Sequence, residues 1–477
     1  MTDPMAMVPA QAAGAMDMTT AITQFENALL AQAEIMGLPS SGVLVEVHQR
    51  VQVLSNMDGA MAGLPREKRA TSMYLSKFML AVSAGLFDAA LNYLWDETIG
   101  ELRKRIIDYD LDYFFDNAVS SDKRKELKGP DDLLKVTDDE LVRAAQKVGF
   151  ISPLGQQQLD LVRHMRNHAS AAHPNQHELQ PYSLLGYMET CIKEVITLPQ
   201  SPTMVQTGRL LANVKTATVT KEEAAGFATL FAGLRRDQSE TLANGLFGIY
   251  VSLDSTPVMR DNVRLLLPHL WPNLSEDMKF AFGTRFARFK ASLDIAQADL
   301  AKEFLQSVDG SSYLPEDVRA AEIDVLLDRL HGAHLSMNNF YNEPPIAKEL
   351  ATYIGSLPVP PGVRAKYASG LVDSFLARSS GIAFAADGLY EQMLLSMTPA
   401  EANLALLYAT GADASSKYLA EIPRKQLDRL IAILTPKLVS RPAQDLMAHV
   451  NAFTGPRQSM AIDSKMVHLR NKLAVTL

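Results

Sequence analysis

The stretch PLGQQQLDLVRHMRNHASAAHP, residues 153–174, has the residue pattern of an amphipathic helix. Placed on a helix at about 100° per residue, it shows one apolar stripe, as a helix that faces a core requires. The stripe consists of Val162, Met165, Ala169 and Ala172. Pro174 removes the next backbone donor and disfavours helical geometry at the residue before it, so we expect the helix to end near His173.

Apolar side chains recur at the same helical spacing almost throughout the chain, and alternation with a period of two is nearly absent. A long amphipathic stretch over 67–107 contains Gly85, which would split it into two helices. One alternative stays open at Val43 to Leu54, where spaced valines would suit a short strand, although nothing nearby offers a partner strand. The sequence therefore predicts an all-α protein.

Helix signals group residues 62–200 into one compact bundle of about four or five helices that is typical of small helical domains. Thr137 followed by Glu140 forms a capping box for a helix that should end near Gly149. The polar stretch 108–129 is predicted to be irregular, with a packed turn at its aromatic residues. The last two helices of the bundle are predicted at 153–173 and 181–198.

Proline marks the organisation of the remaining chain. The stretch 199–206 holds two helix breakers, so we place a domain boundary there, with a linker over 201–216. Beyond it, prolines separate helical segments, and Thr220 with Glu223 offers another capping box. This spacing resembles stacked helical hairpins without a clean repeat consensus. Residues 217–477 are therefore predicted to form an α-helical repeat-like, or solenoid, domain.

The N-terminal residues 1–20 are rich in Met and Ala, and they lack the basic and continuous apolar regions of a signal peptide. We expect a disordered lead there, followed by an N-terminal helical segment over 21–61. No run of about 18 uncharged apolar residues indicates a membrane span. The single cysteine, Cys191, lies on an apolar stripe and indicates a reducing compartment. We therefore expect a soluble, cytoplasmic protein with more than one domain.

The net charge of −8 and the pI near 5.7 provide no overall attraction to nucleic acid or anionic lipid. Any contact with nucleic acid must therefore be local. Three basic stretches, at 103–105, 123–125 and 285–290, are interpreted as solvated helix faces rather than phosphate-binding strips.

Four of the ten histidines lie within residues 164–177, a concentration that requires an explanation. On the predicted helix, Arg166 and His173 are only about 20° from eclipsed, and Ser170 lies beyond them on the same flank. The other flank carries His164 and His168. A histidine near a helix end can change its protonation state near neutral pH. Arg166 and His173 are therefore predicted to share a partly sheltered edge.

An arginine beside a histidine suits one reaction in particular, the cleavage of RNA through attack of a ribose 2′-OH on the adjacent phosphate. The histidine moves the proton, and the guanidinium holds the non-bridging oxygens as charge builds on phosphorus. Because these two groups supply both functions, we expect neither a metal ion nor a cofactor. The sequence contains no Ser or Cys nucleophile motif, Gly-rich phosphate loop or HExxH element.

Arg166-Asn167, followed after five residues by His173-Pro174, resembles the signature of the HEPN superfamily. Members are helical units of about the size of residues 62–200, with the motif at the end of the penultimate helix. The resemblance does not extend to the C-terminal half. It implies a homodimer that brings two Arg/His motifs together, metal-independent endoribonuclease activity on RNA, and a setting in toxin–antitoxin or antiphage (antiviral) defence.

The resemblance also implies roles for individual residues. Arg166 would stabilise the phosphate, Asn167 would orient the site and His173 would act as general acid or base. The supporting residues would be Arg163, His168 and Ser170. An alternative register pairs Arg163 with His168, but those two are about 140° apart on a helix, so we prefer Arg166. The C-terminal half would then sense, inhibit or target, with a regulatory protein as a further partner.

Other interpretations of this segment stay open. Arg166 and His173 would also suit a surface hydrogen-bond cluster with Glu178, and His164 with His168 has the spacing of a zinc-ligand pair. A relative without activity would keep the fold and bind RNA, a nucleotide or a protein. A non-enzymatic helical scaffold is the main alternative of a different class.

Two more sets of residues have a functional and a structural interpretation. Asp96 and Glu97, next to Trp95, would either tune the histidine of the motif or lie on a solvated face beside a packed indole. His331 and His334 have no carboxylate pattern near them in the sequence, so no second site is proposed there.

Overall fold

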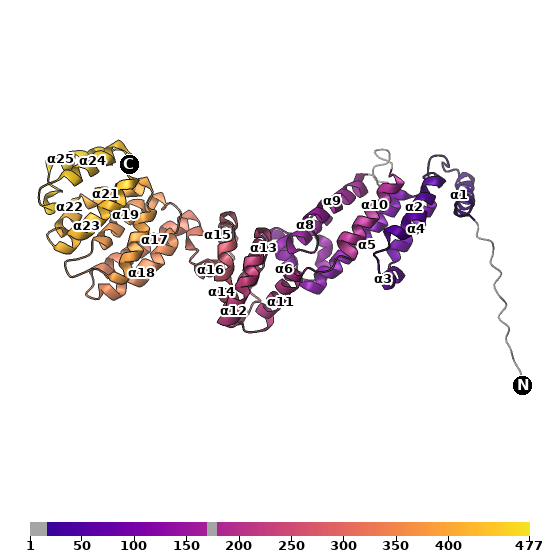
Figure 1. The fold of residues 1–477 in the computed structure, drawn as a ribbon, viewed down its shortest axis with the longest axis horizontal. Coiled ribbons are helices and arrows are strands. Elements are labelled where there is room, and N and C mark those ends of the chain that lie inside the picture. Colours follow the sequence, from indigo (N-terminus) through magenta and orange to yellow (C-terminus); the bar gives the residue numbers. More distant parts are fainter. Residues whose placement is uncertain (1–16, 169–178) are drawn as a thin grey trace, which may run out of the picture. The chain divides into compact units, whose positions relative to one another are not determined.

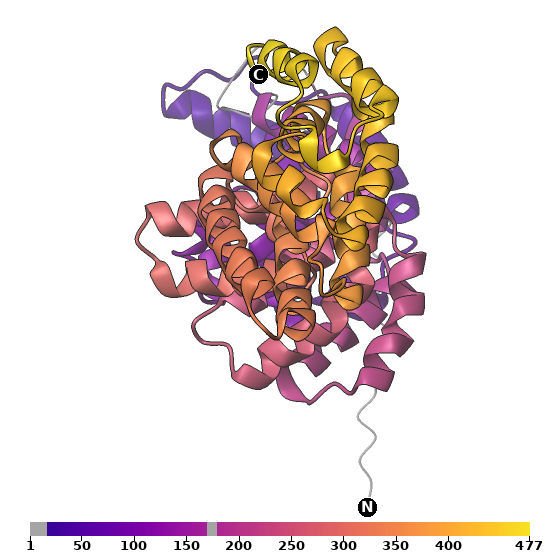
Figure 2. The ribbon, with the colours of Figure 1, turned by 90° about the vertical axis from the view of Figure 1, so that its left-hand side faces the viewer.

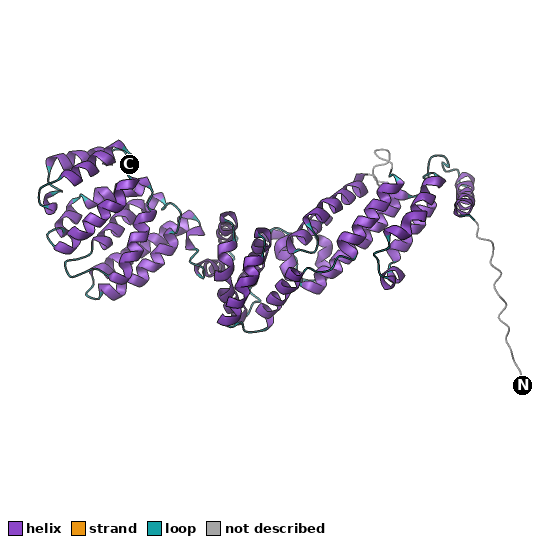
Figure 3. Ribbon diagram, viewed as in Figure 1, coloured by secondary structure: helices purple, strands orange, loops and turns teal. Residues whose placement is uncertain are grey.

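The computed structural model describes residues 17–168 and 179–477, and in these ranges the chain is helical (Figure 3). One isolated bridge joins Arg378 and Gly381 within the described residues. The predicted all-α class is confirmed. No helix in the described ranges is both long and apolar enough to cross a membrane. The chain divides into two compact units. The first comprises Met1–Thr218 and Thr229–Gly248, and the second comprises Val219–Ala228 and Ile249–Leu477.

The first unit contains helices α1 to α11, drawn from indigo to magenta in Figure 1. Helices α12 and α13 each contribute residues to both units. The helices are α1 (Met18–Ile35), α2 (Val47–Ala60), α3 (Arg66–Thr71), α4 (Met73–Ala84), α5 (Phe87–Tyr109), α6 (Leu111–Ala118), α7 (Ser121–Arg124), η1 (Pro130–Lys135), α8 (Asp138–Val148), α9 (Pro153–His168), α10 (Pro181–Cys191), η2 (Ile192–Ile196), α11 (Pro202–Thr216), α12 (Lys221–Gly233) and α13 (Arg236–Val251).

The long helix α5 is the centre of this unit, and α4, α9 and α10 all pack on it. Its apolar face is buried, including Trp95 and Leu94. The helix α2 packs against both α4 and α10, so the bundle includes part of the segment 21–61 as well as 62–200. The bundle therefore begins earlier than the sequence pattern indicated, because α2 supplies a face that α10 needs to bury.

Two predicted capping boxes are present. At α8, Glu140 N–H donates to Thr137 Oγ1 at 3.3 Å, and Thr137 N–H donates to Glu140 Oε2 at 2.9 Å. At α12, Thr220 N–H donates to Glu223 Oε2 at 2.8 Å, and Glu223 N–H donates to Thr220 Oγ1 at 3.2 Å. Each pair satisfies two backbone donors that a helix start leaves open, which is why this local signal is reliable.

The predicted split at Gly85 is also confirmed. Gly85 ends α4 in the left-handed region, with φ +82°, and α5 starts two residues later. The guanidinium of Arg50, a fully buried residue of α2, lies directly over Gly85 and pairs with Glu26 at 2.7 Å. Arg50 Nε also donates to Val45 O at 2.5 Å. One buried cation thus joins α1, α2 and the turn between α4 and α5.

Gly85→Ala is expected to destabilise the first unit by roughly 2 to 3 kcal/mol, because it adds backbone strain and displaces a buried charge. An alanine Cβ would lie 2.6 Å from Arg50 Nε. The measurement is urea unfolding of the full chain carrying Trp271→Phe, so that fluorescence reports Trp95 alone. Gly100→Ala is the control, since nothing lies within 4 Å of a Cβ there. Equal midpoints for both variants would contradict the prediction.

The open alternative of a strand at 43–54 is wrong, because α2 covers most of this stretch. The buried residues of α2 are Arg50, Val53 and Met57, which follow helical spacing. The β-branched valines favour a strand only weakly, and packing against α4 and α10 decides the outcome. The stretch 108–129 is likewise more regular than predicted, since α6 and α7 form there. Tyr113, Phe114 and Phe115 are buried, as the predicted packed turn requires.

The linker predicted over 201–216 is a helix, α11, and it belongs to the first unit. Pro202 occupies the first helical turn, where no backbone donor is lost, and Ser201 Oγ caps the helix by accepting from Met204 N–H at 3.2 Å. Lys215 Nζ also donates to both carboxylate oxygens of Asp110, at 2.8 Å each. The proline that suggested a boundary is a helix start, and the units divide beyond it.

The second unit contains stacked helices, drawn from pink through orange to yellow in Figures 1 and 2. The helix α17 packs on α18 and α19, α18 on α20, and α19 on α21, so each helix contacts the second one after it. This order is that of stacked hairpins. The elements are α14 (Pro257–Leu270), η3 (Trp271–Asn273), α15 (Glu276–Ala291), α16 (Ile295–Gln306), η4 (Ser311–Tyr313), α17 (Glu316–Leu335), α18 (Asn339–Ile354), α19 (Pro361–Leu376), α20 (Phe384–Ser396), α21 (Pro399–Ala409), α22 (Ala412–Lys417), α23 (Glu421–Leu434), η5 (Thr435–Lys437), α24 (Arg441–Ala452), η6 (Arg457–Ser459) and α25 (Ser464–Ala474).

Candidate functional site

Arg166 and Asn167 lie in the last turn of α9. Near the start of this helix, Ser152 Oγ accepts a hydrogen bond from the backbone N–H of Gly155 at 2.9 Å. The buried residues of α9 are Gly155, Leu159 and Val162. Arg166, one turn after Val162, is half-buried, and Asn167 is exposed. The helix therefore places Arg166 at the edge of its core-facing stripe, as the spacing predicted.

Two amide oxygens hold the guanidinium of Arg166. Arg166 Nε donates to Asn92 Oδ1 at 3.0 Å, and Nη1 donates to Asn167 Oδ1 at 3.2 Å. Asn92 lies on α5, where its own Nδ2 donates to Asp88 O at 3.1 Å and so directs its oxygen toward Arg166. Nη2 has no hydrogen-bond partner among the residues that the structure describes. Two of the three guanidinium nitrogens are thus held by amide oxygens.

Asp96 lies one turn beyond Asn92 and shares the electrostatic environment of Arg166. Partial desolvation raises the pKa of Asp96 above its usual value, and the Asp138 carboxylate adds to this effect. The positive charges of Arg166, Arg103 and Lys77 oppose the rise without cancelling it. A carboxyl group whose pKa is raised is easier to protonate than an ordinary aspartate. Asp96 is therefore part of the candidate site.

Trp95, next to Asp96, faces the core and not the site. Its side chain is buried, and its Nε1–H donates to Asp138 Oδ2 at 2.7 Å. The structural interpretation of this indole is confirmed. Asp138 is also 3.8 Å from Arg103 Nη2, so the carboxylate links α8 to two positions on α5.

The supporting residues separate into different environments. Arg163 Nη2 donates to Asp139 at 2.9 Å and to Asp160 at 3.3 Å, so two carboxylates hold this guanidinium. The rings of His164 and His168 lie 4.2 Å apart between centroids, as expected for residues one turn apart. Because Arg163 is already paired, the register that uses Arg163 and His168 is less suited to phosphate binding than the one that uses Arg166.

The other residues of the predicted site lie in a part of the chain outside the described ranges. These are Ser170, His173, His177 and Glu178. The convergence of His173 on Arg166 therefore stays a prediction from the sequence, as does the surface cluster with Glu178. Among the residues of 17–168 and 179–477, no three His, Cys, Asp or Glu side chains are grouped as a metal site would require.

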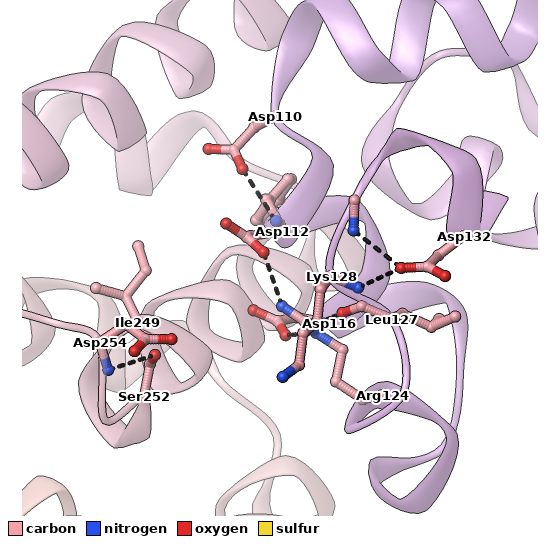
Figure 4. A network of polar contacts seen from close by, with 12 residues as sticks. Asp110, Asp112, Asp116, Arg124, Leu127, Lys128, Asp132, Ile249, Ser252 and Asp254 are labelled. Carbon is pink, nitrogen blue, oxygen red and sulfur yellow. Dashed lines mark hydrogen bonds and ion pairs between the residues drawn. The ribbon is translucent and has the colours of Figure 1, made fainter.

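The basic stretch 123–125 is held by neighbouring acidic residues. Arg124 Nε donates to Asp116 Oδ1 at 2.6 Å, and its Nη2 donates to Asp112 Oδ1 at 3.0 Å (Figure 4). Its Nη1 donates to Leu127 O at 2.6 Å, so all three nitrogens are used. Lys123 Nζ contacts Glu140 at 2.6 Å. These cations stabilise the region around α6 and α7 and are poor candidates for phosphate binding.

A second polar cluster, not identified from the sequence, lies inside the second unit. His334 on α17 and Glu343 on α18 are each 1% exposed, and His334 Nδ1 is 3.0 Å from Glu343 Oε1. Asn339 Nδ2 donates to the same oxygen at 2.9 Å, and Tyr390 OH donates to Oε2 at 2.8 Å. Burial would raise the pKa of Glu343, but the hydrogen bonds from His334 and Asn339 outweigh it, so the pKa ends below its usual value.

The cluster continues to α22 through the far side of the imidazole. Lys417 Nζ lies 3.4 Å from His334 Nε2 and 2.7 Å from Asp373 Oδ1, and Tyr408 OH donates to Asp373 Oδ1 at 2.6 Å. Since the carboxylate of Glu343 accepts from Nδ1–H, the lysine can donate to Nε2. The imidazole of His334 thus lies between an acidic and a basic group. The only sequence signal was the helical spacing of Asn339 and Glu343.

Cys191 is fully buried, and burial raises the pKa of its thiol to about 12. A thiol with such a pKa has almost no nucleophilic thiolate at neutral pH. The predicted packing role of Cys191 is confirmed.

Comparisons with known protein families, curated proteins and solved structures found no match to this chain.

Proposed function

We propose that this protein is a metal-independent endoribonuclease whose phosphate-binding group is Arg166. The proposal depends on one observation. Asn92 and Asn167 hold this guanidinium through Nε and Nη1, and Nη2 is bonded to neither of them. A cation held in one orientation before the substrate arrives stabilises developing charge without reorganisation. Arg166 lies on α9, the helix before α10, which supports the resemblance to HEPN proteins.

The proposed reaction is an internal transesterification. The ribose 2′-oxygen attacks phosphorus as its proton passes to a base, and the bond to the 5′-oxygen breaks as that oxygen receives a proton from an acid. His173 takes one of these proton-transfer roles, on the resemblance alone. Asp96, whose pKa is raised beside Arg166, is suited to assist with the other. Asn167 orients Arg166, which stabilises the non-bridging oxygens through charge-assisted hydrogen bonds.

The proposal extends to assembly and biological setting. A homodimer would bring two copies of the motif together, as the resemblance implies. The second unit, with its stacked helices, would sense, inhibit or target the nuclease through a regulatory protein partner. Growth arrest in a toxin–antitoxin or antiphage system would be the corresponding role, with the protein in the cytoplasm.

Arg166→Ala is expected to reduce RNA cleavage by at least about 100-fold, because it removes the group that holds the phosphate. Arg166→Lys is expected to recover little activity, since a point charge does not reproduce the planar guanidinium. The measurement is the initial rate of cleavage of a labelled single-stranded RNA in the presence of EDTA. His173→Ala is assayed beside it, and circular dichroism verifies that each variant is folded.

Arg163→Ala provides the matched control, because it removes a guanidinium from the same helix that is held by Asp139 and Asp160. Its cleavage rate should stay within about threefold of the wild-type rate, as expected for a partly exposed ion pair. Loss of activity in Arg163→Ala with retention in Arg166→Ala would favour the other register. Unchanged cleavage in Arg166→Ala and His173→Ala would reject the nuclease proposal.

A second candidate function is a non-catalytic scaffold that binds protein, or RNA without turnover. It is favoured by the stacking of α17, α19 and α21 and of α18 with α20, because stacked hairpins present an extended surface to partners. Such a protein would yield no RNA product with any variant. Affinity purification would instead recover a stoichiometric protein partner.

A further inference from the structure

Two tyrosines and one lysine form an exposed cluster beside Arg166. The rings of Tyr74 on α4 and Tyr93 on α5 lie 6.5 Å apart between centroids at an interplanar angle of 33°. Lys77 Nζ lies 5.2 Å from the centre of the Tyr74 ring and 5.6 Å from that of Tyr93. Tyr74 is 39% exposed and Tyr93 is half-buried. These three residues are called the tyrosine cluster below.

Helix α5 connects the tyrosine cluster to Arg166. Asn92, which holds Arg166, directly precedes Tyr93. On the helix, Asp96 lies about 40° from Asn92 and about 60° from Tyr93, between the two. Consistent with this geometry, Asp96 interacts electrostatically with both Arg166 and Lys77. Asp96, between Asn92 and Tyr93 on α5, thus relates the Arg166 site to the tyrosine cluster.

Lys77 differs from several other cations in this part of the bundle, which are paired with carboxylates. Lys68 pairs with Glu101, Arg103 lies by Asp138, and Arg163 binds Asp139. No carboxylate of the described residues lies within ion-pair distance of Lys77 Nζ, which instead contacts the two aromatic rings. A lysine that is exposed and held near rings by weak cation–π contacts can turn toward a phosphate at low cost.

Aromatic faces beside a cation are the elements with which proteins bind single-stranded nucleic acid. Every base has a π-face, so stacking on a tyrosine tolerates any sequence, while the cation contacts the backbone. A duplex keeps its bases stacked inside and cannot use such a platform. Stacking also does not read the 2′-OH, so single-stranded DNA should bind here without being cleaved.

We infer that the tyrosine cluster is a base-stacking subsite for the nucleotide next to the phosphate held by Arg166. This inference rests on the proposed function for the position of that phosphate. A base stacks on Tyr93 or Tyr74, and Lys77 contacts the adjoining phosphate. With such a subsite, the preferred substrate is single-stranded RNA, and the enzyme has little preference for its sequence.

The test is the binding of fluorescein-labelled oligo-dT to the full chain, measured by fluorescence anisotropy over a series of salt concentrations. Tyr93→Ala and Tyr74→Ala are each expected to weaken binding by about 5- to 100-fold, the usual effect of losing one stacked base. Tyr93→Phe keeps the ring and should bind within about twofold of wild type. Lys77→Ala should reduce the salt dependence by about 0.7 in the slope of log K against log salt, corresponding to one phosphate contact.

The matched control is Tyr182→Ala, which removes a tyrosine that is 68% exposed on α10 and outside the cluster. It should leave binding unchanged. If wild type cleaves RNA and Tyr93→Ala binds and cleaves equally well, the subsite is rejected and the nuclease proposal stands. If wild type cleaves no RNA but Tyr93→Ala abolishes oligo-dT binding, the nuclease proposal is rejected and the subsite stands. Failure of wild type to bind oligo-dT rejects the subsite.

Discussion

Gly283→Ala is expected to destabilise the second unit by more than about 4 kcal/mol, the range reached by overpacking at a site that cannot relax. Gly283 lies on α15, and a Cβ at this position would be 1.8 Å from the carbonyl oxygen of Tyr313 and 2.8 Å from its carbonyl carbon. These are backbone atoms of η4, so no side chain can rotate away. The neighbouring Phe282 is fully buried, so an outward shift of α15 would expose it at a cost in free energy.

Trp271 provides the measurement, because its ring stacks on Phe282 with centroids 6.1 Å apart. Urea unfolding of the full chain carrying Trp95→Phe would follow this indole alone. Gly332→Ala on α17 is the control, since nothing lies within 4 Å of its added Cβ and alanine favours a helix. An unfolding midpoint of Gly283→Ala equal to that of the control would mean that α15 and η4 do not approach this closely.

Glu343→Ala is expected to cost the second unit about 3 to 5 kcal/mol, because it leaves buried donors without an acceptor. His334, Asn339 and Tyr390 all donate to this carboxylate. Glu343→Gln should cost less, since the amide retains the volume and one oxygen. Urea unfolding monitored by the fluorescence of Trp271 would give both values. Glu349→Ala, on the same helix but 43% exposed and paired only with Arg329, should change stability by less than about 1 kcal/mol.

The pH dependence gives an independent test of the same cluster. The folded state lowers the pKa of Glu343, and also that of Asp373, where the Lys417 charge and hydrogen bond outweigh the effect of burial. Each depressed pKa contributes stability that is present above the unfolded-state pKa and lost as the pH falls toward the folded-state pKa. Wild-type stability should therefore fall in acid from about pH 5 downward. Glu343→Gln should show a shallower fall, and an identical slope would contradict the assignment.

The candidate site shows how far the sequence could be interpreted. The helical spacing of Val162 and Arg166 placed the guanidinium on the edge of the core-facing stripe, and the structure agrees. The partner that holds it, Asn92, is 74 residues away in the sequence and lies in no recognisable motif. Asn92 accepts a hydrogen bond from Arg166 only because α9 packs on α5.

The buried cluster in the second unit was missed for the same reason. His334 and Lys417 are 83 residues apart, and the helices between them bring the two side chains together. The sequence does not indicate that Glu343 pairs with His334, because a glutamate on a helix is usually solvated. Its burial becomes evident only when α18 is packed between α17 and α20.

The sequence by itself determined those features whose causes lie within one or two helical turns. The helical class follows from apolar periodicity, the break at Gly85 from glycine in the left-handed region, and the capping boxes from paired side chains three residues apart. Only the tertiary structure decided that 47–60 is a helix and which side chains surround Arg166 and His334. Local hydrogen bonds can be predicted from neighbouring residue types, whereas long-range contacts depend on how helices pack.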